Sequence, residues 1–121
     1  MAIRRFEDIR AWQEARALVK MIYGLTRQDA LAQDFGLKDQ LQRAAVSAMT
    51  NIAEGFDCDS NAEFARFLGY SRRSTVELQS LLYATLDAGY ISEEVFQQHY
   101  DQANKVKAMV SAFKRSLQKR D

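Results

Sequence analysis

Apolar residues return every third or fourth position along most of the chain, which is the spacing of one face of an α-helix. In the second of four such stretches the apolar face is Leu37, Leu41, Ala44, Ala45, Ala48 and Ile52. In the fourth it is Phe96, Tyr100, Ala103, Val106, Val110, Phe113 and Leu117. No stretch alternates between apolar and polar residues as a half-buried strand does, so the pattern predicts helices only.

Start and stop signals set the expected bounds of these helices. The first runs from about Asp8 to Arg27, and its apolar positions are Trp12, Ala15, Val19, Ile22, Tyr23 and Leu25. Residues 28 to 35 are predicted to be a connection, with Asp34 capping the second helix. Gly55 is predicted to end that helix in a left-handed conformation, with Phe56 folding back over it.

The third helix is predicted from about Asn61 to Ala88. Ser60 and Glu63 form a capping box at its start, and Gly89 closes it with Tyr90 and Ile91 folding over the end. Its apolar positions are Phe64, Phe67, Leu68, Leu78, Leu81 and Leu82. The middle of this face is small and polar, with Ser71 and either Ser74 or Thr75, so a neighbouring helix can approach closely there.

Ser92 is the expected cap of the fourth helix. Four helices joined by short turns predict an all-α, antiparallel up-down four-helix bundle. A chain of 121 residues is about one domain, so residues 1–121 are expected to form a single bundle.

Charge is unevenly distributed although the net charge is only +1. Residues 1 to 53 carry eight Lys/Arg against six Asp/Glu, residues 54 to 101 carry three against nine, and residues 102 to 121 carry six against one. The balances of +2, −6 and +5 describe an acidic middle and a basic C-terminal region. Both are candidate surfaces for recruiting a partner.

Cysteine content and the N-terminal pattern favour the cytoplasm. Cys58 is the single cysteine, so no intrachain disulfide or thiolate metal cage is expected. The first residues carry charges where a signal peptide needs an apolar run, and no later stretch is apolar enough to span a membrane. No membrane association is predicted.

Motifs for catalysis or metal binding are incomplete. The turn Asp57-Cys58-Asp59-Ser60-Asn61 resembles the opening of a calcium loop, but Ala62 and Leu68 stand where that loop needs Gly and Glu. His99, the single histidine, has Phe96 where a bundle metal site needs Glu. Cys58 precedes a helix N-terminus, which lowers a thiol pKa, but no base partner is evident. We predict no catalytic residue, cofactor or metal, and thus no enzyme.

Polar residues flank the apolar faces of the second and third helices. Arg43, Ser47, Asn51 and Glu54 step by four, four and three residues along one side of the second helix. Across from them on the third lie Arg72, Ser74 and Glu77. Two interpretations remain open, a polar layer between the helices and a solvated surface. A buried version must be almost fully paired, because an unpaired buried charge is costly.

The basic residues form a candidate nucleic-acid contact. They are Arg4 and Arg5 near the start and Lys105, Lys107, Lys114, Arg115, Lys119 and Arg120 near the end. At 100° per residue the six C-terminal cations spread around most of the helix outside its core face, and cations are favoured near a helix C-terminus in any case. Symmetric repetition in an oligomer would gather them into a stronger field.

Several segments together resemble a known family. FEDIRAWQEARALV, FGLKDQLQRAAVSAMTNIAEGF, EFARFLGYSRRSTVELQSLL and LDAGYIS are similar to the four-helix-bundle family of 23S rRNA intervening-sequence proteins, also called S23 ribosomal proteins. The chain is also similar to the accessory variability proteins of diversity-generating retroelements. The match runs from Phe6 to about Leu117. It departs at Met49, where the family often has proline.

The resemblance implies a bacterial cytoplasmic four-helix bundle that assembles into a homo-oligomeric ring, a homopentamer, and it supplies no catalytic residue. Our leading hypothesis is a non-enzymatic, oligomeric scaffold or adaptor that binds nucleic acid, structured RNA above all, through basic residues of the first and fourth helices. The alternative is a protein–protein interaction adaptor that makes no nucleic-acid contact and whose partner docks on the acidic middle of the chain.

Overall fold

The computed structural model describes residues 2–119, which are helical apart from short turns and contain no strand. A 3-10 helix, η1 (Phe6–Asp8), precedes α1 (Arg10–Thr26), the short α2 (Asp29–Gln33), α3 (Phe35–Phe56), α4 (Asn61–Asp87) and α5 (Glu93–Lys119). The prediction of an all-α fold is confirmed.

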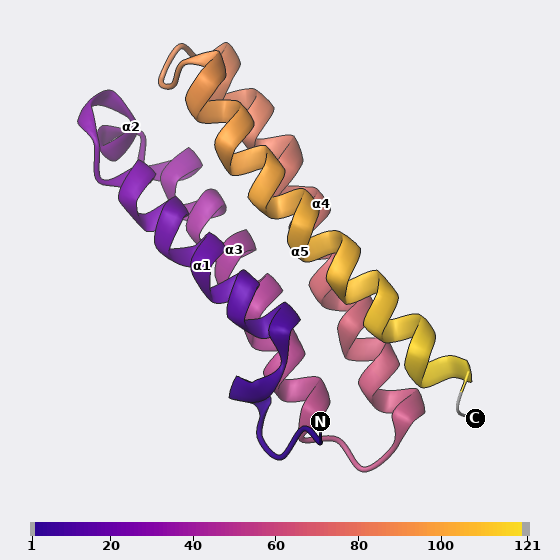
Figure 1. Ribbon diagram of the computed structural model, residues 1–121. Helices are drawn as coiled ribbons and strands as arrows, with labels where there is room; N and C mark the ends of the chain where they lie inside the picture. The colour runs from indigo at the N-terminus through magenta and orange to yellow at the C-terminus, as the bar shows by residue number, and fades with distance from the viewer. Residues whose placement is uncertain (1, 120–121) are drawn as a thin grey trace.

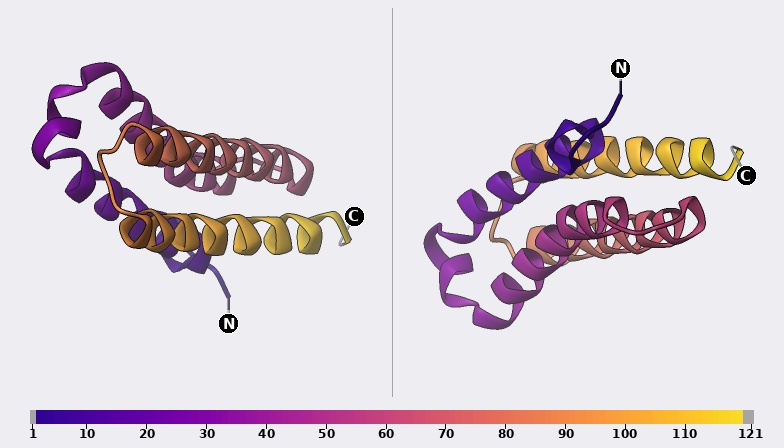
Figure 2. Two further views of the ribbon diagram at one scale, coloured as in Figure 1. Left: turned by 90° about the horizontal axis from the view of Figure 1, so that it is seen from above. Right: turned by 90° about the horizontal axis from the view of Figure 1, so that it is seen from below.

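The four long helices lie side by side, and each runs opposite to the next along the chain (Figures 1 and 2). α3 packs against α1 and α4, while α5 packs against α4 and α1. Each long helix therefore has two neighbours around one common interior. The turn between α4 and α5 lies at the same end as α2, and the turn between α3 and α4 lies at the other end (Figure 1).

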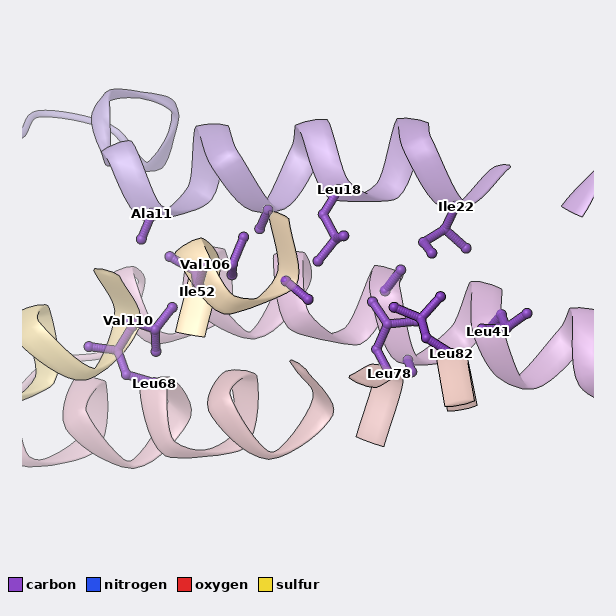
Figure 3. Packing of buried hydrophobic residues seen from close by; sticks show 14 of the residues in the cluster. Ala11, Leu18, Ile22, Leu41, Ile52, Leu68, Leu78, Leu82, Val106 and Val110 are labelled. Carbon is purple, nitrogen blue, oxygen red and sulfur yellow. The ribbon is translucent and has the colours of Figure 1, made fainter. Parts of the chain in front are cut away.

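Side chains from all four long helices fill this interior (Figure 3). The fully buried large residues include Leu18 and Ile22 of α1, Leu41 and Ile52 of α3, Leu68, Leu78 and Leu82 of α4, and Val106 and Val110 of α5. On α5, five predicted core residues are buried, and Tyr100 and Phe113 are half-buried against them. The helical periodicity therefore identified the core of α5 correctly.

The buried face of α1 differs from the predicted one. It consists of Ala11, Ala15, Leu18, Ile22, Leu25 and Thr26. Trp12 and Val19 are half-buried at its edge, and Tyr23 is 37% exposed. The apolar arc of α1 is wider than its contact with α3 and α5, so the small alanines face the interior and the bulky residues lie at the edge.

The predicted N-terminal caps are present. The side chain of Asp34 accepts a hydrogen bond from the Leu37 amide at 3.2 Å, and Ser60 Oγ accepts one from the Glu63 amide at 3.1 Å. The capping box at Ser60 is only half formed, because the Glu63 carboxylate pairs with Arg66 at 3.3 Å. Ser92 Oγ accepts from the Val95 amide at 3.1 Å.

The connection predicted for residues 28 to 35 contains one additional helix, α2, which anchors it. Leu31, in the middle of α2, is 2% exposed and belongs to the core. Asp29 begins the turn with a φ of +46°, a region that aspartate tolerates better than most residues. Burial of Leu31 therefore fixes a segment that was predicted to be a connection without a helix.

The prediction that Gly55 ends the second long helix is wrong. Gly55 lies inside α3, which continues to Phe56, and Gly89 is the glycine with positive φ among residues 2–119. A Cβ at Gly55 would lie 2.8 Å from both Phe64 Cδ1 and Phe67 Cβ. Glycine is needed there because α4 crosses the last turn of α3 too closely for any side chain. α3 also passes through Met49 without a break.

Gly89 ends α4 as predicted, with a φ of +80°. The Gly89 amide donates to the Leu86 carbonyl at 2.9 Å and the Tyr90 amide to the Thr85 carbonyl at 3.2 Å, the hydrogen-bond pair of a Schellman cap. Tyr90 and Ile91 then pack against the core. The Tyr90 hydroxyl donates to Asp34 Oδ2 at 2.8 Å, so one carboxylate caps α3 and holds the α4–α5 turn.

We expect Tyr90→Phe to melt at a lower temperature than the native chain at neutral pH. The hydrogen bond to Asp34 raises the pKa of Tyr90 above its ordinary value of 10.0, and partial burial adds to this. The stabilisation is therefore complete below pH 10.0 and is lost as the pH rises through the higher pKa of the folded state. Thermal melts across the alkaline range check this, because the difference between the two proteins should disappear there.

Tyr70→Phe is the matched control for that experiment. The Tyr70 ring lies 5.5 Å from that of Phe67. Its hydroxyl has no hydrogen-bond partner within residues 2–119. A loss of melting temperature as large for Tyr70→Phe as for Tyr90→Phe would contradict the role given to the Asp34 contact.

Within the described part of the chain, none of the helices combines the length and apolar character that crossing a bilayer requires.

Candidate functional site

A small polar cluster joins α3 to α4. Ser47 Oγ and Ser74 Oγ lie 2.8 Å apart, and Asn51 Nδ2 donates to the Ser47 carbonyl and to Ser47 Oγ at 2.9 and 3.0 Å. Deeper in the interface, the buried Ser71 donates to the Ala48 carbonyl at 2.6 Å. The structure thus brings Ser47, Asn51 and Ser74 together, and the layer they form is uncharged.

The charged residues predicted for this layer lie on the surface. Arg43 is exposed and pairs with Asp39 at 3.5 Å, and Glu54 and Glu77 are also exposed. Arg72 turns towards α5, where its Nε donates to Ser111 Oγ at 3.0 Å. Desolvating a charge within the α3–α4 contact would be costly, whereas these side chains keep their charges in water.

Polar contacts also tie the other helix pairs. Gln42 of α3 donates to Thr26 of α1 at 3.0 Å, and Gln102 of α5 donates to the Glu14 carboxylate at 3.0 Å. That hydrogen bond, with the charge of Lys105, lowers the pKa of Glu14. Among residues 2–119 no buried side-chain nitrogen or oxygen lacks a hydrogen-bond partner. These contacts set the register of the helices.

The candidate reactive groups have structural roles or unfavourable surroundings. His99 is 8% exposed, and its Nδ1 lies 2.8 Å from the Val95 carbonyl one turn earlier. Partial burial raises the pKa of the Cys58 thiol, and the carboxylates of Glu63, Asp57 and Asp59 raise it further. The expectation that a helix N-terminus would lower this pKa is therefore wrong. No group of three or more potential metal ligands occurs within residues 2–119.

The segment that carries the two N-terminal arginines lies at the same end of the molecule as the C-terminal half of α5, because Ile3 lines one surface hollow with Phe113 and Leu117. Arg4 and Arg5 lie beside Glu54 and Asp57 at the C-terminal end of α3. Arg5 also pairs with Glu7 at 2.8 Å. Glu7 therefore offsets part of the charge of Arg5.

The cations of α5 divide between two sides of the helix. Lys105 faces α1 and pairs with Glu14 at 3.5 Å. Lys107 faces α4 and donates to Gln79 Oε1 at 3.1 Å. The Lys114 ammonium reaches over Gly69 of α4, while Arg115 and Lys119 are exposed. Arg120 lies outside the described residues.

Antiparallel packing adds two arginines to this set. The contact between Arg72 and Ser111 brings Arg72 and Arg73 of α4 level with the C-terminal half of α5. We call the resulting surface the α4–α5 basic face; it consists of Arg72, Arg73, Lys107, Lys114 and Arg115. Residues 64 to 73 and 105 to 119 together contain no Asp or Glu, so no carboxylate from either segment offsets this charge.

The other end of the same helix pair is acidic. Residues 74 to 104 contain no Lys or Arg, and their five carboxylates are Glu77, Asp87, Glu93, Glu94 and Asp101. All five are exposed. The α4–α5 pair therefore has a basic half beside the α3–α4 turn and an acidic half beside the α4–α5 turn.

Neither Arg72 nor Arg73 belongs to the basic set predicted from the sequence. Arg72 was grouped by position with the polar residues of α3, whereas its neighbour in space, Ser111, lies about 40 residues later. The geometry of an antiparallel helical hairpin is enough to identify both arginines from the sequence. Residues equally far from the α4–α5 turn must lie side by side, as Gln79 and Asn104 do.

A second group of cations lies on α1. Arg16, Lys20 and Arg27 are exposed and follow helical spacing along one side of α1 with Tyr23. The Arg16 guanidinium stacks over the Trp12 ring at 5.9 Å from its centroid. α1 does not pack against α4, so this surface is separate from the α4–α5 basic face.

Comparison with known proteins agrees with this architecture. A sequence model described as 23S rRNA-intervening sequence protein matches residues 7–112. The chain belongs to this family. No curated protein sequence matches it.

A solved structure has the same fold as this member of the 23S rRNA-intervening sequence family. It is a crystal structure of a protein with unknown function from the S23 ribosomal protein family of Bacteroides thetaiotaomicron. The two superpose with a TM-score of 0.72 over 85% of this chain and 93% of the other, at 18% sequence identity. At that identity the likeness concerns the fold alone.

Proposed function

We propose that this protein is a non-enzymatic four-helix-bundle scaffold of the bacterial cytoplasm that binds nucleic acid through the α4–α5 basic face. The observation that carries the proposal is that five cations from two helices gather beside the α4–α5 junction. Glu77, one turn after Arg73, is an exposed carboxylate at the border of this group. Such a surface matches the regular negative charge of a phosphate backbone. The family name refers to rRNA, which is a reason to test RNA first.

The same proposal includes assembly into a homo-oligomeric ring, with a homopentamer as the expected form. One bundle presents five cations on the α4–α5 basic face, and its net charge is only +1. Repeating the face around a symmetry axis would multiply the local field without changing the fold. Size exclusion coupled to light scattering tests the subunit count, and a monomer across the concentration range would end the ring proposal.

We expect binding of RNA or DNA to weaken steeply with salt. If all five cations of one face contact phosphates, log Kd should change with log salt by about 3.5 for a single strand and 4.5 for a duplex. Affinity would then fall about 100-fold for a single strand and about 500-fold for a duplex between roughly 50 and 200 mM salt. Fluorescence anisotropy with a labelled oligonucleotide measures this slope. No binding at the lowest salt, or binding indifferent to salt, would overturn the nucleic-acid proposal.

The acidic half of the α4–α5 pair favours a second candidate function. Its five exposed carboxylates, without a lysine or arginine between residues 74 and 104, form a surface suited to a basic protein partner. An adaptor of this kind would keep its partner after nuclease treatment. Charge reversal at Lys114 and Arg115 would leave that partner bound, whereas it would release a nucleic acid.

A further inference from the structure

Two stripes of side chains meet along the outer junction of α4 and α5. The α4 stripe is Arg72, Val76, Gln79 and Tyr83, and the α5 stripe is Tyr100, Asn104, Lys107, Ser111 and Lys114. Contacts join them along their length: Arg72 to Ser111 at 3.0 Å, Lys107 to Gln79 at 3.1 Å, and Tyr83 to Tyr100 at 5.8 Å between ring centroids. We call this surface the α4–α5 junction strip.

Tyr83 presents an aromatic surface at one end of the strip. Its side chain is 50% exposed, although its ring centroid lies only 4.7 Å from that of the buried Phe96. Tyr100 packs against both rings, with its centroid 5.8 Å from that of Tyr83 and 5.4 Å from that of Phe96. Because two aromatic rings already hold Tyr83 in place, stacking a further ring on it costs little side-chain entropy.

Charge is graded along the strip. Two of its cations, Arg72 and Lys114, lie towards the α3–α4 turn, and the third, Lys107, lies at the middle of the strip, where it contacts Gln79. Glu77, next to Val76, is exposed near that middle. Asp87, one helical turn beyond Tyr83, and Asp101, next to Tyr100, are exposed at the other end. Phosphates are therefore attracted as far as Lys107 and repelled beyond Tyr83, so an uncharged ring is the group suited to Tyr83.

The spacing matches a short run of polynucleotide. Arg72 and Tyr83 are 11 residues apart on one continuous helix, which corresponds to about 16 Å along the axis. A cationic track with an aromatic platform is the arrangement by which proteins hold single strands, whose unpaired bases have an open face for stacking. A duplex keeps its bases stacked on one another and offers this platform only phosphates and groove edges.

We propose that the α4–α5 junction strip binds a single-stranded polynucleotide, with phosphates along Arg72, Lys107 and Lys114 and one unpaired base stacked on Tyr83. This inference rests on the proposed function and specifies its ligand. Stacking needs only a π-face, so the strip accepts RNA and DNA and selects strandedness over sequence.

The test compares Tyr83→Leu with the full-length native protein. The probes are single strands of about 16 nucleotides, as RNA and as DNA, and a duplex of the same sequence. We expect Tyr83→Leu to bind the single strands about 5-fold to 100-fold more weakly and to bind the duplex as the native protein does. Tyr83→Trp, which keeps an aromatic face, is expected to bind single strands at least as tightly as the native chain.

Tyr23→Leu is the matched control. Tyr23 is 37% exposed and lies beside Lys20 and Arg27, so it reproduces a tyrosine flanked by cations. It lies on α1, which does not pack against α4. Single-strand affinity should therefore be unchanged in Tyr23→Leu.

The outcomes separate this inference from the proposed function. If Tyr83→Leu binds both single strands as tightly as the native protein, or if Tyr83→Trp binds them as weakly as Tyr83→Leu, the proposed stacking site is wrong. The proposed function would still stand in that case, provided that the native protein binds the duplex in a salt-dependent manner. If the native protein binds neither single strand nor duplex, both fail. If Tyr83→Leu weakens binding of the RNA strand alone, or of the DNA strand alone, the stacking site is supported and the sugar is also recognised.

Discussion

Replacing Gly55 by alanine is expected to destabilise the protein by about 1–3 kcal/mol, the cost of overpacking a well-packed interior. The added methyl group would lie 2.8 Å from Phe67 Cβ, which is fixed to the backbone of α4, as well as from Phe64 Cδ1. α4 would have to move away from α3 to relieve the contact. Gly55→Val should be worse, because its two methyl groups extend the same clash. Urea unfolding followed by circular dichroism measures the loss as a lower midpoint.

Gly24→Ala is the control for this substitution. Gly24 also lies within a helix, α1, but a Cβ there would meet no atom within 4 Å. Alanine at this position should stabilise the protein by about 0.5–1 kcal/mol, because it lowers the conformational entropy of the unfolded chain and has a higher helix propensity than glycine. Opposite signs for the two glycines are the expected pattern. Equal stabilisation would mean that the α3–α4 contact at Gly55 is looser than described.

The double variant Arg72→Glu with Lys114→Glu, which reverses two charges on the α4–α5 basic face, is expected to bind nucleic acid about 100-fold more weakly at low salt. It removes two phosphate contacts and adds two repulsive charges. The salt dependence of log Kd should also fall by about 1.4 for a single strand. Arg72 is exposed and Lys114 half-buried, so the change in folding stability should be small. Anisotropy titrations at several salt concentrations give both quantities.

Arg16→Glu with Lys20→Glu makes the same change in net charge on the exposed side of α1. Because that surface is separate from the α4–α5 basic face, affinity should fall much less, through the long-range field alone. If the α1 pair weakens binding as much as the α4–α5 pair, net charge governs binding and the assigned interface is wrong. If neither pair affects binding, phosphate contact itself is refuted.

Local chemistry explains which elements were predictable. Ser60, Ser92 and Gly89 act on backbone groups within a few residues, so their caps depend on neighbours in the sequence and were predicted correctly. In the sequence, Gly55 follows the last apolar position of its helix and precedes Phe56, as a glycine that ends a helix does. Its actual role depends on Phe64 and Phe67, which approach it only when α3 and α4 pack.

The predicted sites depended even more on packing. Sequence spacing placed Ser47, Asn51 and Ser74 on facing sides of two helices, and the structure joins them. The same spacing grouped Arg72 with them, although Arg72 and Ser74 are two residues apart and so lie about 200° apart around the helix. Ser74 contacts α3 and Arg72 contacts α5. Both residues border the apolar face, and periodicity alone does not say which neighbouring helix each edge of that face meets.

The sequence by itself determined the class of this protein: its apolar periodicity requires long helices around one interior, its caps bound those helices, and its motifs match a family. Tertiary structure alone decided which charges act together. Folding back at Gly89 places Arg72 and Arg73 beside Lys107, Lys114 and Arg115, and it separates them from the carboxylates at the other end of the pair. Helix formation is local, whereas an electrostatic surface is a sum over residues that meet only after packing.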